Sequence, residues 1–353
     1  MKLILHIGPN KTGTTTLQHC FRDNRKKLRR MGVFYPAMPL RFSQHFALVP
    51  ALSNGELGQN NFGCRKIWGD VDFLAPSLKL WNKFLRLARW NRAKYLLISS
   101  EFISSFGPKQ IAYMSNFLSQ YFEDITIVAY ARNPAEHFFS AYQQSVKING
   151  HIANFGALSN RRFQIWSEPD NFKLSVRPYA RERLLNGDII DDFMATYLPH
   201  VDQSRLIAPK SSRNVSLSTE AISVLEDLIP GIKPDVDQFK RRVIWMEIAR
   251  EMIKFDSQVP NGTRPRMRAD LNKHLSEQIS ELLWLKAEYG IEFEHVDYSK
   301  IEENSLADKK VYKIQDMCEV DLTRKAELEN RLHSLSKSKL SDAFNFLGLD
   351  QES

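Results

Sequence analysis

Short apolar runs alternate with amphipathic segments along the first two thirds of the chain. Continuous runs rich in β-branched and aromatic residues predict strands at 3–7, 33–36, 95–99, 125–131, 173–179 and 205–207. Apolar positions with a 3.6-residue period predict helices at 17–28 and 76–90, from Pro108, from Pro134 and after Gly187. Strands that alternate with helices need crossover connections, so this pattern predicts a mostly parallel sheet with helices on both faces.

The last third of the chain carries only the helical period. Helices are predicted at 235–255, 270–289 and 321–347, the last with a polar surface typical of docking or oligomerisation. We therefore expect a three-layer α/β core at 1–230 and a helical C-terminal region at 231–353 that packs on it.

Composition narrows the class of protein. The 353 residues carry a net charge of +8, which suits an anionic cofactor or an acidic acceptor, with nucleic acid as the rival partner. The three cysteines are too few and too scattered for a disulfide framework or a zinc site, which favours a reducing, cytoplasmic setting. No apolar run approaches the ~20 residues of a membrane span, and a cleaved leader would remove the first strand.

The first chemical motif follows the first strand. Gly8 and Gly13 bracket a loop that leads into a helix, and such a loop aims backbone N–H groups and the positive helix end at an anion. The spacing of the glycines matches a Walker A loop, but Thr14 stands where that motif has its Lys. The only lysine of the loop is Lys11, from which an ammonium group can reach the bridging oxygen of a phosphoanhydride.

The second motif follows the strand at 125–131. Asn133 and Pro134 suit the N-cap and first position of a helix, which places Arg132 at the strand end. Ser140 lies two turns into that helix. A guanidinium and a hydroxyl that converge there would suit a phosphate group.

Together the two motifs resemble those of sulfotransferases that use 3′-phosphoadenosine 5′-phosphosulfate (PAPS). The Lys-Ser/Thr-Gly-Thr-Thr signature of that family is matched by Lys11, Thr12, Gly13, Thr14 and Thr15. The family's Arg and Ser for the 3′-phosphate, eight residues apart, are matched by Arg132 and Ser140. The resemblance covers about residues 2–230 and implies a P-loop NTPase-like fold, PAPS as the cofactor and no required metal. The late Arg-Lys-Gly triplet of the small-molecule branch is missing, and Arg213 is a candidate substitute.

The resemblance also implies a general base for the acceptor proton. Glu101 follows the strand at 95–99, where the small-molecule branch has its catalytic His, and His45 lies roughly where the heparan-type branch has its catalytic Glu. Either residue has a structural alternative, Glu101 as a helix cap and His45 as a loop residue. We favour Glu101, because a carboxylate at the end of a central strand is costly to keep there without a function.

The acceptor is expected to be a hydroxyl or amine of a carbohydrate, with the aromatic residues of the 37–75 loop (Phe42, Phe62, Trp68 and Phe73) as candidate sugar platforms. Two other functions stay open. A P-loop kinase or nucleotide-binding protein would turn over ATP or GTP with Mg²⁺, and a nucleic-acid-binding protein would bind with steep salt dependence. The sequence gives no indication of the oligomeric state.

Overall fold

The computed structural model describes residues 1–58, 62–156, 163–207, 217–262, 264–303, 307, 309–337 and 339–349. The chain divides into two compact units. The sheet unit consists of residues 1–133, 161–211 and 281–292, and the helical unit of residues 134–160, 212–280 and 293–353.

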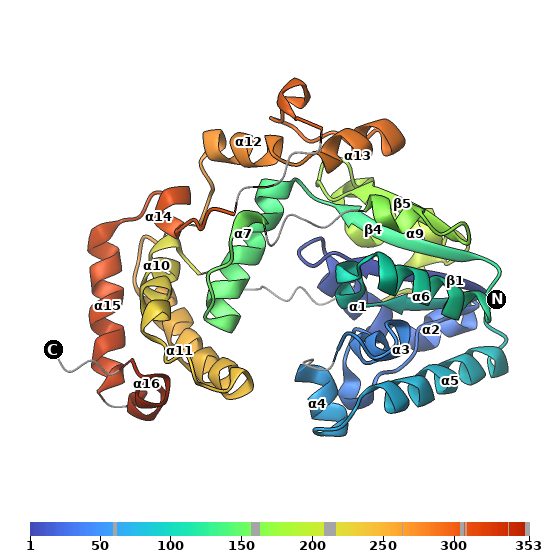
Figure 1. Cartoon of the computed structure of the whole chain (residues 1–353), viewed down its shortest axis with the longest axis horizontal. Helices are drawn as coiled ribbons and strands as arrows, with labels where there is room; N and C mark the ends of the chain where they lie inside the picture. The colour runs from blue at the N-terminus through green and yellow to red at the C-terminus, as the bar shows by residue number, and fades with distance from the viewer. Residues whose placement is uncertain are drawn as a thin grey trace. The chain divides into compact units, whose positions relative to one another are not determined.

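The sheet unit is α/β, with an all-parallel sheet in the order β2-β3-β1-β4-β5. Strands β1, β4 and β5 are labelled in Figure 1. The strands are β1 (Lys2–Gly8), β2 (Val33–Phe34), β3 (Tyr95–Ser99), β4 (Ile125–Ala131) and β5 (Phe172–Pro178). Strand β1 is central, and it pairs His6 with Ser99 of β3 and with Val128 of β4. The carboxyl ends of these three strands therefore meet at one edge of the sheet, here named the carboxyl edge.

Both faces of β1 are buried, which explains its continuous apolar sequence. On one face, Ile4 packs in a core cluster with side chains of α1 and α9, among them Phe21 and Phe193. On the other face, Leu3, Leu5 and Ile7 are also buried. The helices of the sheet unit are α1 (Thr14–Asp23), α2 (Arg25–Arg30), α3 (Val49–Leu52), α4 (Phe62–Trp68), α5 (Leu74–Trp90), α6 (Pro108–Ser119), α9 (Ile189–Tyr197) and α13 (Glu281–Tyr289).

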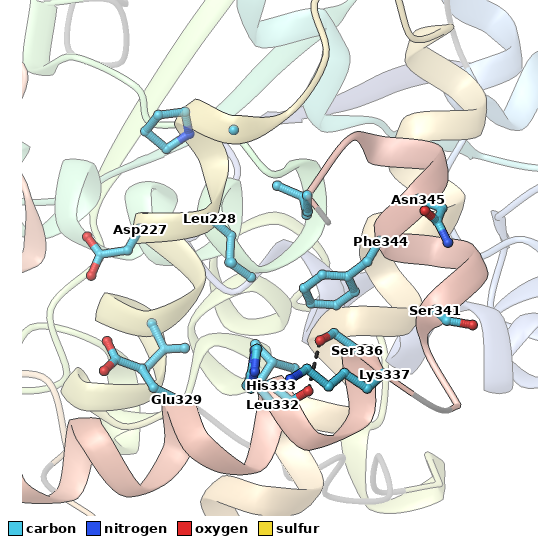
Figure 2. Close-up of a pocket in the computed structure, with 14 residues that line it drawn as sticks. Asp227, Leu228, Glu329, Leu332, His333, Ser336, Lys337, Ser341, Phe344 and Asn345 are labelled. Carbon is cyan, nitrogen blue, oxygen red and sulfur yellow. Dashed lines mark hydrogen bonds between the residues drawn. The ribbon is translucent and has the colours of Figure 1, made fainter. Parts of the chain in front are cut away.

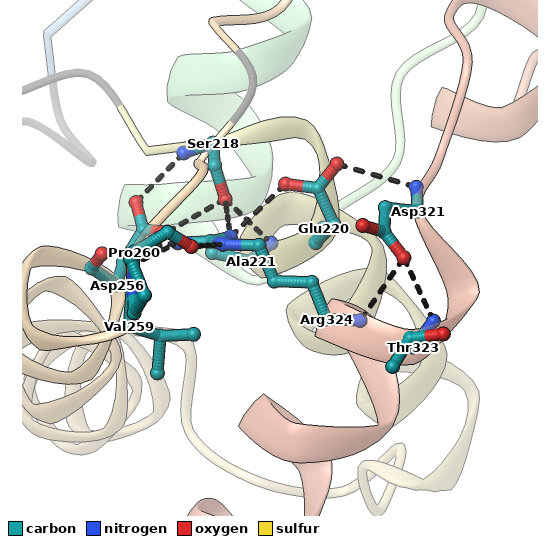
Figure 3. Close-up of polar contacts among 9 residues, drawn as sticks. All are labelled: Ser218, Glu220, Ala221, Asp256, Val259, Pro260, Asp321, Thr323 and Arg324. Atoms are coloured by element: carbon teal, nitrogen blue, oxygen red, sulfur yellow. Dashed lines mark hydrogen bonds and ion pairs between the residues drawn. The ribbon is translucent and has the colours of Figure 1, made fainter.

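The helical unit contains α7 (Pro134–Gln144), α10 (Thr219–Leu228), α11 (Gln238–Gln258), α12 (Ala269–Glu277), α14 (Ile314–Met317), α15 (Leu322–Ser336) and α16 (Ser341–Leu347). One buried arginine joins three of its segments (Figure 3). The Arg324 guanidinium on α15 donates to Glu220 of α10 over 3.0 Å and to Asp256 of α11 over 2.7 Å. It also donates to Ser218, the N-cap of α10, over 2.6 Å. Because the guanidinium is buried, these bonds fix α15 against α10 and α11.

The boundaries of the two units differ from the single boundary at residue 230 expected from the sequence. Helix α7 belongs to the helical unit, because it packs against α12 and because the turn after it accepts a bond of 2.7 Å from the Trp245 indole to the Val146 carbonyl. Helix α13 belongs to the sheet unit, where the Tyr289 hydroxyl donates to the Leu174 carbonyl of β5. Contacts between distant segments set these boundaries.

Four predicted elements are wrong. The helix at 17–28 is two helices, since α1 ends at Asp23 and α2 begins at Arg25. The strand at 205–207 is absent, because the Asp202 carboxylate starts a 3₁₀ turn at 203–205 and the Asn24 side chain bonds both backbone groups of Ile207. The helix at 321–347 is two helices, since α15 ends at Ser336 and α16 begins at Ser341. The helix at 270–289 is likewise divided into α12 and α13, which lie in different units.

Candidate functional site

The loop after β1 has the backbone of an anion cradle. Gly8, Lys11 and Gly13 all have positive φ, at 93°, 65° and 75°. The Thr12 hydroxyl donates to the Pro9 carbonyl over 2.6 Å and is buried. Lys11 is half-buried, and Thr15 is exposed. Thr12 thus fixes the loop from inside while Lys11 and Thr15 lie at its surface.

The loop leads directly into the N-terminus of α1. Gly13 is the N-cap and has no side chain to cap the helix, and the first turn contains no acidic residue. The first N–H groups of a helix have no intrahelical acceptor, and the helix dipole adds partial positive charge there. This helix start can therefore donate hydrogen bonds to an anion, next to Lys11.

Gly13 is fixed by side chains far along the chain. A Cβ added at Gly13 would lie 2.6 Å from Ile189 Cδ1 and 3.0 Å from Tyr179 Cε2. Ile189 begins α9, which the Asp188 carboxylate caps, and Tyr179 directly follows β5. Sequence reasoning assigned neither Ile189 nor Tyr179 to the site, although the place of Tyr179 at a strand end was the available signal.

Arg132 lies beside the same loop. It follows β4, which pairs with β1 through Gly8 and Ala129. Its Nη1 donates to the Lys11 carbonyl over 3.2 Å, and its guanidinium lies 5.9 Å from the centre of the Tyr179 ring. Arg132 is half-buried. The structure thus brings Arg132 of the second motif to the first motif, with its guanidinium bonded to the backbone of the loop.

Glu101 approaches the loop from the other side. It begins a 3₁₀ turn after β3, and its Oε2 accepts a hydrogen bond of 3.1 Å from the Thr14 hydroxyl. Gly8 allows this approach, since a Cβ there would lie 3.2 Å from the Glu101 Cα. Behind Glu101, the buried Ser99 hydroxyl bonds the Gln18 amide and the His6 ring. These bonds link the end of β3 to β1 and α1.

His45 has a different environment. Its ring is fully buried, Nδ1 accepts from the Ser99 N–H over 3.1 Å, and Nε2 donates to the Pro36 carbonyl over 3.1 Å. Burial lowers the pKa of His45 to about 4. Protonation of Nδ1 would also remove the acceptor that Ser99 uses. These contacts connect the loop after β2 to the end of β3, as expected of a structural histidine.

Two predicted cofactor residues are not in the described part of the sheet unit. Ser140 is half-buried in α7 of the helical unit, and Arg213 lies outside the described residues. Among the aromatic residues of the 37–75 loop, Phe73 is buried and packs on Trp68, with ring centres 5.9 Å apart. Phe42 packs on Phe46, with ring centres 4.8 Å apart. These rings contribute to packing, and none is shown to face a ligand.

Among the described residues, no group of three or more potential metal ligands occurs. The described helices also include none that is long and apolar enough to cross a membrane. The helical unit has a cavity of about 1430 Å³ between α10, α15 and α16 (Figure 2). Leu228, Leu332 and Phe344 give it an apolar wall, and Asp227 and Glu329 lie at its polar side. It contains none of the predicted site residues.

The chain was compared with known protein families, curated proteins and solved structures. No significant match was found in any of the three comparisons.

Proposed function

We propose that this protein is a PAPS-dependent sulfotransferase with a P-loop NTPase-like core. In this proposal it moves a sulfuryl group from PAPS to a hydroxyl or amine of a carbohydrate acceptor, in the cytoplasm, without a required metal. The three cysteines are buried free thiols, which fits a reducing compartment. The strand order and the loop after the central strand support the P-loop comparison.

One observation carries the proposal: three kinds of group converge on the loop at the carboxyl edge. Lys11 and the uncapped start of α1 offer positive charge and N–H donors. Arg132 bonds the loop backbone at 3.2 Å, and Glu101 contacts Thr14 at 3.1 Å. Transfer from an anionic donor to a neutral acceptor requires a cation, a guanidinium that binds phosphate and a carboxylate. All three groups surround one helix N-terminus here.

The roles of these groups follow from the chemistry of an in-line displacement. A bond forms between the acceptor oxygen and sulfur, and the bond between sulfur and the bridging phosphate oxygen breaks. Lys11 and the first amides of α1 neutralise the negative charge that builds up on that leaving oxygen. Adenosine 3′,5′-bisphosphate then leaves, and Arg132 holds its 3′-phosphate. Ser140 stays a prediction from the sequence for the same phosphate.

We assign the general base to Glu101 and a positioning role to His45. Glu101 is half-buried beside the loop, where its carboxylate can take the acceptor proton. The His45 ring is enclosed, and both its nitrogens bond to backbone. His45 therefore acts through the end of β3, which leads into Glu101.

Ligand-induced thermal stabilisation tests the cofactor. Without metal, adenosine 3′,5′-bisphosphate should stabilise the protein more than adenosine 5′-phosphate or ATP. In Arg132→Ala, affinity for the bisphosphate should fall about ten- to a hundredfold, because one charge-assisted contact is worth roughly 1.5–3 kcal/mol. Affinity for adenosine 5′-phosphate should change little, since it has no 3′-phosphate. Lys109→Ala, an exposed cation on α6, is the control.

Two results would contradict the proposal. Preferential stabilisation by ATP with Mg²⁺ would indicate the kinase alternative. If Arg132→Ala lowers the affinity for both nucleotides equally, Arg132 does not bind a 3′-phosphate. Sulfuryl transfer to a panel of glycans, measured with labelled PAPS, then tests the acceptor class, and transfer to phenols alone would remove the carbohydrate from the proposal.

A further inference from the structure

Helix α5 presents a basic outer face to solvent. Lys79, Lys83, Arg86 and Trp90 recur at intervals of four, three and four residues, so they form one stripe about 16 Å long. All four are exposed, and the Trp90 side chain is 78% exposed. The opposite side of the helix carries buried residues such as Trp81 and Phe84. The helix is thus anchored by its apolar side, and its outer side is cationic.

The charge continues beyond the end of α5. Arg92 and Lys94 are exposed in the segment that leads into β3. The Lys94 N–H donates to the Gly32 carbonyl over 2.8 Å, which places this segment beside the end of α2 and its exposed Arg30. We name this set the basic face: Lys79, Lys83, Arg86, Trp90, Arg92, Lys94 and Arg30. Within the described part of the chain, no carboxylate forms an ion pair with any of its cations.

The candidate site does not account for this charge. Lys94 and Arg30 precede β3 and β2, so they lie at the amino edge of the parallel sheet, whereas Lys11, Glu101 and Arg132 lie at the carboxyl edge. Compensation of the helix dipole involves only the last turn of a helix. Dipole compensation therefore explains the position of Arg89, but it does not explain the positions of Lys79 and Lys83. Helix α5 contains no acidic residue at all.

We propose that the basic face binds the surface of an anionic phospholipid bilayer, a function separate from the proposed transfer reaction. Lys79, Lys83, Arg86 and Trp90 project from one side of a single helix, so they lie along one line of the surface. Cations near an anionic leaflet add their attractions, and a tryptophan side chain partitions into the headgroup region. Trp90 lies in the same stripe as three cations, so one plane can receive all four side chains.

Vesicle co-sedimentation of the full chain tests this proposal. Binding is expected to phosphatidylcholine vesicles that contain roughly 30% phosphatidylglycerol, but not to pure phosphatidylcholine, and it should weaken with added salt. Combined Lys79→Glu, Lys83→Glu and Arg86→Glu should reduce partitioning about a hundredfold or more. Trp90→Phe should reduce it about three- to tenfold. The difference in emission between the wild type and Trp90→Phe should shift to shorter wavelength on the vesicles.

A matched variant separates this face from overall charge. Lys109→Glu, Lys240→Glu and Arg250→Glu change three exposed cations outside the basic face and give the same net charge. This variant should keep most of the binding. An equal loss in both triple variants would overturn the proposal, because general attraction would then explain the binding. Absent vesicle binding, together with tight binding of duplex DNA or heparin through Lys79, Lys83 and Arg86, would also overturn it in favour of a chain-like polyanion. Circular dichroism of each variant checks the fold.

Discussion

At the residue scale, Thr14 and Glu101 share a hydrogen bond of 3.1 Å that connects the start of α1 to the end of β3. A carboxylate in this position is oriented by the same helix turn that would bind the nucleotide. The position of the base would then depend on the geometry of the anion loop.

Substitution of Glu101 by Gln tests the base. The amide keeps an oxygen that accepts from Thr14, but it has almost no basicity. With PAPS and an accepted glycan, kcat should fall by about 10²–10⁴-fold with little change in nucleotide affinity. Thr14→Val, which removes the orienting hydroxyl, should lower kcat less than Glu101→Gln does. A Glu101→Gln enzyme of normal kcat would contradict the assignment.

His45 makes stability depend on pH. Its pKa is about 4 in the folded protein because of burial, against 6.5 for the free side chain. The unfolded chain therefore binds a proton more readily, so the free energy of unfolding falls as pH falls from 6.5 towards 4. Between about pH 7.5 and about pH 5 the wild type should lose about 2 kcal/mol more than His45→Gln.

Urea unfolding at the two pH values measures this difference. His6, whose pKa burial lowers to about 3, is present in both proteins and cancels. Identical pH dependence in the two proteins would show that His45 is not held neutral in the fold.

At the element scale, Gly13 shows how α9 limits the anion loop. Gly13→Ala adds a Cβ at 2.6 Å from Ile189 Cδ1, at a φ of 75° that is unfavourable for alanine. We expect a loss of about 1–3 kcal/mol of stability and weaker nucleotide binding. Gly32→Ala has a similar φ of 83°, but its nearest neighbour is the flexible Lys94 side chain at 3.5 Å.

The comparison of Gly13→Ala with Gly32→Ala separates the cost of backbone strain from the cost of the contact between the new Cβ and Ile189. Ile189→Val removes Cδ1, so it should restore part of the stability that Gly13→Ala loses, measured by thermal unfolding. If Gly13→Ala and Gly32→Ala cost the same, packing against α9 does not shape the loop.

Arg324 gives the corresponding test in the helical unit. Arg324→Met leaves the Glu220 and Asp256 carboxylates buried without their cation, which should cost about 3–5 kcal/mol in urea unfolding. Arg331→Met on the same helix breaks only a surface pair with Glu327 and should cost less than about 1 kcal/mol. Similar small effects for both would mean that Arg324 does not hold α15 in place.

The elements differed in how far the sequence could predict them. All five strands of the sheet were predicted, and the three inner ones, β1, β3 and β4, are the buried and mainly apolar runs that mark a central strand. The positions of Lys11, Glu101 and Arg132 at the carboxyl edge followed from their places at strand ends. The burial of His45 depends on Ser99 and Pro36, distant partners that no local pattern indicates. The break after Ser336 was missed because the helical period continues across it.

At the scale of the whole molecule, each unit is assembled from separate segments of the chain. A fragment of residues 1–230, the core expected from the sequence, lacks α13 and contains α7 and α10 without α11, α12 and α15. We expect this fragment to aggregate or to bind a hydrophobic dye, because the apolar sides of α7 and α10 lose their partners. A monodisperse fragment with cooperative unfolding, seen by size-exclusion chromatography and calorimetry, would contradict this division.

The packing of Gly13 against Tyr179 and Ile189 also has a consequence for the order of events during synthesis. Lys11 and Arg132 are synthesised early, so a nascent chain of about 160 residues already contains both motifs. It still lacks β5 and the two side chains that close the loop on its far side. Under the proposed function, nucleotide binding would therefore arise only after the start of α9 has emerged. A chain terminated earlier would contain both motifs without the packed loop.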